Sequence, residues 1–241
     1  LKHPRAHAAV LTANLIFGMN FSAVQHLTHG YIGPFALNIL RVGVSSLLLW
    51  AWWLVSPDPV RLQRKHLGRF LLCALTGVVI NQSLFIQGLS MTLSIHAALL
   101  ILVTPVFISL VAFWLGKEPL GLLKTAGLTA GIAGATLLAL QKERQGGGSN
   151  ILWGDILIII NAISYAFYFV LVRPLMQVYR PVTVIRWVFS FGLILILPIG
   201  AAQFVQIRWA SFCWPEFALL AFVVLGATFF AYLFNLYRIH R

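Results

Sequence analysis

Long, uninterrupted apolar segments constrain this chain more than any other feature of its sequence. A helix needs about 20 apolar residues to cross about 30 Å of hydrocarbon, and eight segments reach that length. They lie at residues 7–27, 34–55, 67–89, 93–115, 120–140, 151–173, 183–204 and 214–237. The segments lack the alternating apolar and polar residues of membrane β-strands. The sequence therefore predicts an all-α membrane protein, a polytopic bundle in which eight transmembrane helices are present.

The overall composition excludes several other classes of protein. The chain is 60% hydrophobic and only 9% charged, whereas a soluble domain is about 45–50% apolar and about 25% charged. So little charge cannot keep 241 residues in water. A soluble enzyme, a disordered protein and a nucleic-acid binder are all excluded on this basis, and the lipid bilayer is the expected surrounding.

The basic residues predict the orientation of the chain, because lysine and arginine gather at cytoplasmic helix ends. Of the 17 lysines and arginines, thirteen lie at one set of segment ends. Three lie at the opposite set, namely Lys142, Arg144 and Arg208, and Arg41 lies inside a segment. We therefore expect a multi-pass protein of the plasma (inner) membrane whose N-terminus and Arg241 end are both cytoplasmic. The net charge of +12 is then an orientation signal, and no nucleic-acid partner is expected.

Three matches at nearly one offset indicate an internal repeat. Residues 15–21 resemble 163–169 at an offset of 148, Pro34 matches Pro181 at 147, and residues 77–85 resemble 226–234 at 149. The first copy then covers residues 1–140 with five spans, and 141–150 is a flexible linker. Since five is odd, the second copy, residues 151–241, starts on the opposite side of the membrane, which is an inverted-topology repeat. Residues 93–140 have no counterpart, so we expect the complete protein to have ten helices, two more than this sequence.

Several short motifs in these spans resemble one family. Span one carries Phe17-Gly18-Met19-Asn20-Phe21, span two carries Pro34 and Arg41, span four leads to Gly116-Lys117-Glu118, and span six carries Gly154-Asp155 and Ser164-Tyr165-Ala166. Together they are similar to the EamA-type branch of the drug/metabolite transporter superfamily. The resemblance implies a ten-helix inner-membrane carrier of small metabolites or amino acids.

Arg41 is the most informative single residue. It lies seven residues after Pro34, about 10 Å below the outer end of its span at about 1.5 Å per residue. A charge at this depth is costly and is normally paired or turned toward a wet cavity. Arg41 either attracts a substrate carboxylate or has a structural role, in which it bonds backbone carbonyls or extends toward the interface.

Further polar residues within the spans are candidates for substrate binding. They are Asn20, Asn81, Gln82, Asn161, Tyr165 and Tyr168. Asn161, Tyr165 and Tyr168 share one helix face because of their i, i+4, i+7 spacing. Facing inward, these amides and phenols can bind the polar groups of a small zwitterion. Alternatively, they join helices through hydrogen bonds of about 0.6 kcal/mol each.

Titratable residues near the span ends give weaker evidence of a functional role. His96 lies near the outer end of span four, where it is either a proton relay or a packed or interfacial side chain. Asp155 lies in the first turn of span six, where a carboxylate favours the helix N-terminus. Because no acid occupies a span centre, proton exchange through a buried carboxylate is not expected. Facilitated exchange, or coupling through a group outside this sequence, fits better.

Gly127, Gly131 and Gly134 form a stripe of small residues in span five. Such stripes let helices approach closely. We expect packing within one chain, with a homodimer interface as the alternative.

These features favour a secondary carrier that moves a small polar or amphipathic metabolite by alternating access. The expected direction of transport is efflux. The alternative is a non-transporting membrane fragment or assembly partner that lacks the last two helices. A membrane-embedded enzyme is not expected, because its seven histidines and five acids show no catalytic or metal-binding spacing. No cofactor and no metal site are predicted.

Overall fold

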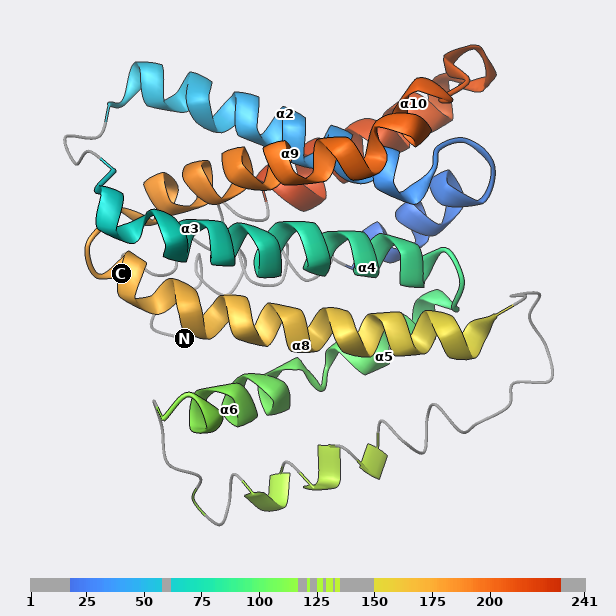
Figure 1. Ribbon diagram of the computed structural model, residues 1–241. Helices are drawn as coiled ribbons and strands as arrows, with labels where there is room; N and C mark the ends of the chain where they lie inside the picture. Colours follow the sequence, from blue (N-terminus) through green and yellow to red (C-terminus); the bar gives the residue numbers. More distant parts are fainter. Residues whose placement is uncertain are drawn as a thin grey trace, which may run out of the picture. The chain divides into compact units, whose positions relative to one another are not determined.

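The computed structural model describes residues 18–57, 62–116, 121, 125–127, 129–131, 133–134 and 150–230, and these residues form helices with no strand among them (Figure 1). The chain divides into two compact units. Unit 1 combines Leu1–Leu62 with Tyr179–Arg241, and unit 2 is Gln63–Val178. Each unit is described by itself.

Five helices in the described part are long and apolar enough to cross a membrane. They are Pro34–Val55, Arg64–Leu89, Ser94–Trp114, Ile151–Met176 and Pro181–Val205. Each coincides with a predicted span to within three residues at either end. A shorter apolar helix, Trp214–Gly226, begins the last predicted span. The spans predicted at 7–27, 120–140 and 214–237 lie partly or largely outside the described residues.

Large apolar side chains are exposed on the surface of the described residues, while several polar side chains are buried. Val55 is 88% exposed and Leu102 72%, whereas Asn38 and Asp155 are at most 2% exposed. Apolar side chains thus face outward, where lipid would cover them, as well as filling the interior. Helices of this length and composition, arranged in this way, confirm a helical multi-pass membrane protein.

Unit 1 is built around α2 (Pro34–Val55) and α9 (Pro181–Val205). Each begins with proline, whose fixed φ and missing N–H suit the first helical position. The two helices are antiparallel: the Phe35 N–H donates to Gln203 Oε1 at 2.9 Å, and Trp50 Nε1 donates to Ser190 Oγ at 2.8 Å. The unit also contains helical residues 18–30, η3 (Trp209–Ser211), α10 (Trp214–Ala221) and η4 (Phe222–Phe230).

Unit 2 is built around α8 (Ile151–Met176). Its other elements are η1 (Arg64–His66), α3 (Leu67–Ala74), η2 (Leu75–Ile80), α4 (Asn81–Leu89), α5 (Ser94–Ile101) and α6 (Thr104–Trp114). η1 to α4 form one continuous helix that lies along α8 (Figure 1). α6 packs on α8 through a small core of Val111, Ala112, Ala166 and Val170.

The backbones of α4 and α8 approach each other closely in unit 2. A Cβ atom on Gly88 would lie 2.9 Å from the Gly154 carbonyl oxygen, and one on Gly154 would lie 2.8 Å from the Gly88 carbonyl oxygen. Only glycine at both positions allows the two backbones to approach this closely. The glycines therefore determine where the polar side chains of α4 and α8 meet.

Candidate functional site

A stripe of polar side chains runs along α2 in unit 1. Asn38, Arg41 and Ser45 share one helix face by their i, i+3, i+7 spacing, and they are 0%, 6% and 1% exposed. Ser45 Oγ has no hydrogen-bond partner among the described residues. We call these three residues the α2 stripe. The sequence pointed only to Arg41, although the spacing of Asn38 and Ser45 relative to it was a usable signal.

A second buried arginine in unit 1 was missed by the sequence analysis. Arg186 was counted there only as an orientation signal, but its side chain is buried on α9. Its guanidinium carbon lies 4.8 Å from the ring centroid of Trp50 and 5.1 Å from that of Trp53. These are cation–π distances. Both buried charged side chains in the described part of unit 1 are thus cationic.

The seven predicted site residues are divided between the two units. Asn20 and Arg41 lie in unit 1, and the other five lie in unit 2. Asn20, on the helix of residues 18–30, is 2% exposed, and its Oδ1 has no hydrogen-bond partner among the described residues. Gln82 on α4 is buried, and its Oε1 likewise has no partner there. Buried acceptors of this kind are able to bind a polar ligand.

Two predicted site residues in unit 2 hold each other directly. Asn81 Nδ2 donates to the Asn161 carbonyl oxygen at 3.2 Å, and Asn161 Nδ2 donates to the Asn81 carbonyl oxygen at 2.6 Å. One turn away, Ser164 Oγ donates to the Thr76 carbonyl oxygen at 2.7 Å. These bonds join α4 and η2 to α8. Both amide nitrogens are used in helix contacts, which is the structural alternative considered for these residues.

The two predicted tyrosines lie farther along the same contact. The ring of Tyr168 packs on Gly77, and the ring centroids of Tyr165 and Tyr168 are 5.9 Å apart. Gly77 lies in η2, a π-helical segment that ends immediately before Asn81. π-helical turns are frequent at functional sites. Asn81, Asn161 and Tyr168 therefore lie along one surface of contact within unit 2, and the Tyr165 ring lies beside that of Tyr168.

The structure reveals a buried polar cluster that the sequence analysis did not assemble. Thr92 Oγ1 donates to Asp155 Oδ1, and His96 Nδ1 lies 3.2 Å from Asp155 Oδ2. We call Thr92, His96 and Asp155 the His–Asp cluster; all three are at most 3% exposed. Asp155 was interpreted as a charge at a helix end. The short link at residues 90–92 and the position of both titratable residues at the same end of their spans were the available signals.

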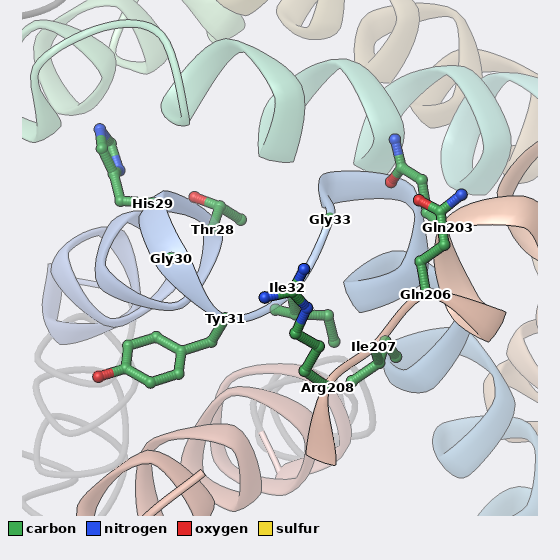
Figure 2. A pocket seen from close by; sticks show the side chains of 10 residues that line it. All are labelled: Thr28, His29, Gly30, Tyr31, Ile32, Gly33, Gln203, Gln206, Ile207 and Arg208. Carbon is green, nitrogen blue, oxygen red and sulfur yellow. The ribbon is translucent and has the colours of Figure 1, made fainter. Parts of the chain in front are cut away.

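A cavity of about 390 Å³ lies in unit 1, where the helix of residues 18–30 turns into α2 and where α9 ends (Figure 2). Gln203, Gln206 and Arg208 contribute polar groups to its lining. The Tyr31 ring extends away from the two glutamines. Its phenol faces Glu216, whose charge and hydrogen bond raise the pKa of Tyr31 above 10.0.

The glycine stripe of span five is only partly in contact with the rest of the chain. A Cβ atom on Gly131 would lie 3.0 Å from Val106 Cγ2 of α6, so Gly131 packs closely within unit 2. Gly127 and Gly134 are exposed and have open space around them.

No three histidine, cysteine, aspartate or glutamate side chains in the described part of the chain are grouped as metal ligands.

Comparison with known proteins identifies the family. The model of the EamA-like transporter family matches residues 4–140, more than half of the chain. The chain belongs to the EamA-like transporter family. EamA-type proteins form a branch of the drug/metabolite transporter superfamily, as the motifs indicated, so the predicted family is confirmed.

Several relatives carry the word transporter in their names. An uncharacterized transporter of Archaeoglobus fulgidus is 27% identical over 168 residues, covering 69% of this chain and 57% of the relative. The uncharacterized transporter YoaV of Bacillus subtilis is 21% identical over 156 residues, covering 65% and 53%. A WAT1-related chloroplastic protein of Arabidopsis thaliana is 27% identical over 162 residues, covering 66% and 39%. The matches thus span between 39% and 57% of these relatives' own length.

A solved crystal structure has the same fold. It aligns with a TM-score of 0.59 at 20% identity, and the alignment covers 96% of this chain and 78% of the other. At this identity the likeness concerns the fold alone.

Proposed function

We propose that this chain forms the core of an inner-membrane secondary carrier that exports small polar or amphipathic metabolites, amino acids among them, by alternating access. Membership of the EamA-like family and the transporter names of its relatives support transport in general. The carrier would move its substrate without chemical change.

The observation that carries the proposal is the α2 stripe. An arginine inside an apolar span costs a few kcal/mol and usually marks a substrate or ion pathway. Arg41 lies between two other buried polar side chains on the same face, Asn38 and Ser45. We assign Arg41 to the anionic group of the substrate, such as a carboxylate. Asn20, also in unit 1, would contribute a hydrogen bond to another polar group of the substrate through its buried Oδ1.

Contacts within unit 1 support the inverted repeat. The repeat offset of 147 relates position 43 to 190 and position 46 to 193. It therefore converts the contact between 43 and 193 into the contact between 190 and 46. A Cβ on Gly43 would lie 3.7 Å from Leu193 Cδ1, and Ser46 Oγ lies 3.3 Å from Ser190 Oγ. The same shift relates the Ile39–Gly200 contact to the Trp53–Arg186 contact. Antiparallel helices whose contacts exchange in this way are expected when a two-fold axis in the membrane plane relates the copies.

The π-helical segments support the same pairing of spans. η2 (Leu75–Ile80) lies in span three, and η4 (Phe222–Phe230) lies in span eight. The repeat offset of 149 takes residues 75–80 to 224–229, inside η4. We therefore retain eight spans in this sequence, with residues 1–140 and 151–241 as the two copies and 141–150 as the linker.

The proposed carrier has a defined orientation in the inner membrane and a candidate surface for a homodimer. The excess of basic residues at one set of ends supports cytoplasmic positions for the N-terminus and Arg241. The exposed Gly127 and Gly134 leave room for a homodimer interface, whereas Gly131 packs within the chain.

The test is exchange in proteoliposomes. The full-length protein is reconstituted in vesicles loaded with a mixture of the proteinogenic amino acids, and efflux is followed by mass spectrometry. Saturable efflux of a subset, with counterflow when that subset is added outside, is the expected result. No movement above empty vesicles would favour an assembly partner that does not transport.

A further inference from the structure

The cavity of about 390 Å³ in unit 1 has a size that suits a small metabolite, because ligand sites usually enclose about 300–1,000 Å³. Residues 28–33 line it where the first described helix turns toward α2, and residues 203 and 206–208 line it where α9 ends (Figure 2). We call it the unit 1 cavity. All of its lining belongs to one unit, and none of it belongs to the α2 stripe.

Arg208 supplies the positive charge of this cavity. Its side chain extends into the space between Thr28 and the two glutamines (Figure 2). No acidic side chain lines the cavity, and the carboxylate of Glu216 interacts with Tyr31 and His26 instead. An arginine near a helix C-terminus often bonds the last carbonyls, but among the described residues no hydrogen bond or ion pair holds this guanidinium. Its donors are therefore available to a carboxylate, which accepts two of them at once.

The negative ends of two helices border the same cavity. After the helix of residues 18–30, the next two backbone N–H groups both donate to the Leu27 carbonyl oxygen, at 3.2 and 3.0 Å. The carbonyls of residues 28–30 therefore lack these two donors. α9 ends at Val205, immediately before the lining of residues 206–208. The carbonyl end of a helix carries a partial negative charge and attracts cations, so this border suits an ammonium group.

The remaining wall combines a fixed amide with apolar side chains. Gln203 Oε1 accepts from the Phe35 N–H at 2.9 Å, which fixes the amide and leaves its Nε2 as a donor. A Cβ on Gly33 would lie 2.8 Å from Gln203 Cδ, so the glutamine packs directly on the turn. Ile32 and Ile207 are buried side chains of the lining. The cavity thus presents a cation, an acceptor-rich border and an apolar surface together.

We propose that the unit 1 cavity binds a neutral α-amino acid in its zwitterionic form. The Arg208 guanidinium and the Gln203 amide nitrogen bind the carboxylate, and the carbonyls at the two helix ends bind the ammonium. Ile32 and Ile207 contact an apolar side chain. The inference rests on the proposed carrier function, and it adds a second site to the path of the same class of substrate. On the proposed orientation this site lies at the outer face, where an exported amino acid leaves the protein.

The experiment measures how a ligand protects a cysteine placed in the cavity wall. The full-length protein, with Cys73 and Cys213 changed to serine, is studied in lipid nanodiscs, where both faces meet water. Thr28→Cys is a suitable reporter, because the Thr28 hydroxyl donates within its own helix, to the Val24 carbonyl oxygen. L-valine should slow the reaction of this cysteine with a thiol reagent. Ser211→Cys, exposed and outside the lining, should react at the same rate with and without L-valine.

Two analogues of valine test the recognition of a zwitterion. 3-Methylbutanoate lacks the ammonium group, and isobutylamine lacks the carboxylate. Each should require a concentration about tenfold higher than L-valine for the same protection, because a hydrogen bond to a charged group contributes about this factor or more. Protection by either analogue at the concentration of L-valine would overturn the assignment of a zwitterion.

The arginine is tested in the same assay. Arg208→Gln should raise the half-protecting concentration of L-valine about tenfold. This side chain is exposed, so the variant should elute as the unmodified protein does in size-exclusion chromatography. Arg64→Gln, which alters an exposed arginine of unit 2, is the matched control and should leave the protection unchanged. If Thr28→Cys does not fold, His29→Cys in the same lining takes its place.

The outcomes separate this site from the carrier function. Absence of protection, or protection that Arg208→Gln retains, would overturn the site even if the protein transports amino acids. Protection that is lost in Arg41→Lys and kept in Arg208→Gln would also overturn it, because the ligand would then act from the α2 stripe. Protection that depends on Arg208, in a protein that moves no amino acid in proteoliposomes, would support the site and contradict the carrier function.

Discussion

The two main helix contacts of this protein, α2 with α9 in unit 1 and α4 with α8 in unit 2, are built from different side chains. In unit 2, glycines bring the backbones together, and asparagine side chains bond the opposite backbone. In unit 1, the contact uses serine hydroxyls, a tryptophan N–H and an arginine held over tryptophan rings. The two units thus solve the same problem, joining antiparallel apolar helices, in different ways.

This difference distinguishes a structural helix contact, between α4 and α8, from a candidate substrate-binding surface on α2. Backbone contact at Gly88 and Gly154 leaves no room for a ligand, so the α4–α8 contact holds unit 2 together. Among the described residues of unit 1, the buried charged side chains are Arg41 and Arg186, both positive. Under the proposed function, an anionic substrate would engage α2 in unit 1, whereas the α4–α8 contact has a structural role within unit 2.

The largest effect should come from Gly154→Val, which breaks the unit 2 contact. Its Cβ would meet backbone atoms of Gly88 and Thr92 at under 3 Å, and overpacking of this kind costs about 3 kcal/mol. The amount of folded protein and its thermal midpoint in detergent, followed by size-exclusion chromatography, should both fall sharply. Gly68→Val in α3 has open space around it and should leave both unchanged. Equal behaviour of the two variants would contradict the contact described.

Arg41→Lys tests the unit 1 side of the comparison. Lysine keeps the charge but loses the planar guanidinium that matches a carboxylate, so we expect about a tenfold loss of transport, or about 1.4 kcal/mol. The amount of protein in the membrane should not change. Arg173→Lys, at the exposed end of α8, is the matched control and should transport normally. If transport and protein amount fall together in Arg41→Lys, the residue is structural.

A double-mutant cycle on Asn81→Ala and Asn161→Ala sharpens the description of unit 2. Each interhelical hydrogen bond within a membrane is worth about 0.6 kcal/mol. Each variant should therefore lower the free energy of unfolding modestly, and transport per folded molecule should stay the same. A large loss of transport at unchanged stability would instead place these amides in contact with substrate.

The smallest predicted effect concerns Tyr31, outside the spans. Glu216 raises the pKa of Tyr31 in the folded state. The stability contributed by the contact between protonated Tyr31 and Glu216 is therefore present below pH 10.0 and is lost as the pH rises through the folded-state pKa of Tyr31. Glu216→Gln should lower the pKa of Tyr31 toward 10.0, as read from ¹³C-tyrosine NMR against a Tyr31→Phe spectrum. An unchanged Tyr31 signal would contradict the contact.

The sequence predicted the helical architecture well because apolar length is a local property. The span at 34–55 coincides with α2, and Ser94–Trp114 lies within one residue of its prediction at either end. Asn161 and Tyr168 both contact the helix that contains η2 and α4, whereas their role in substrate binding stays a prediction. Side-chain pairing across helices was beyond such reasoning, since His96 and Asp155 are 59 residues apart. The burial of Arg186 was missed for the same reason: its tryptophan partners come from another helix.

The most direct test of the central claim asks whether the α2 stripe lines a substrate path. In a background with both native cysteines, Cys73 and Cys213, changed to serine, Ser45→Cys is compared with Leu47→Cys, two residues along and 70% exposed on the apolar surface. A membrane-impermeant thiol reagent should label Ser45→Cys in proteoliposomes, and the transported amino acids should slow that labelling, while Leu47→Cys stays unlabelled. Equal inertness of the two cysteines, with or without amino acids, would contradict a substrate path along α2.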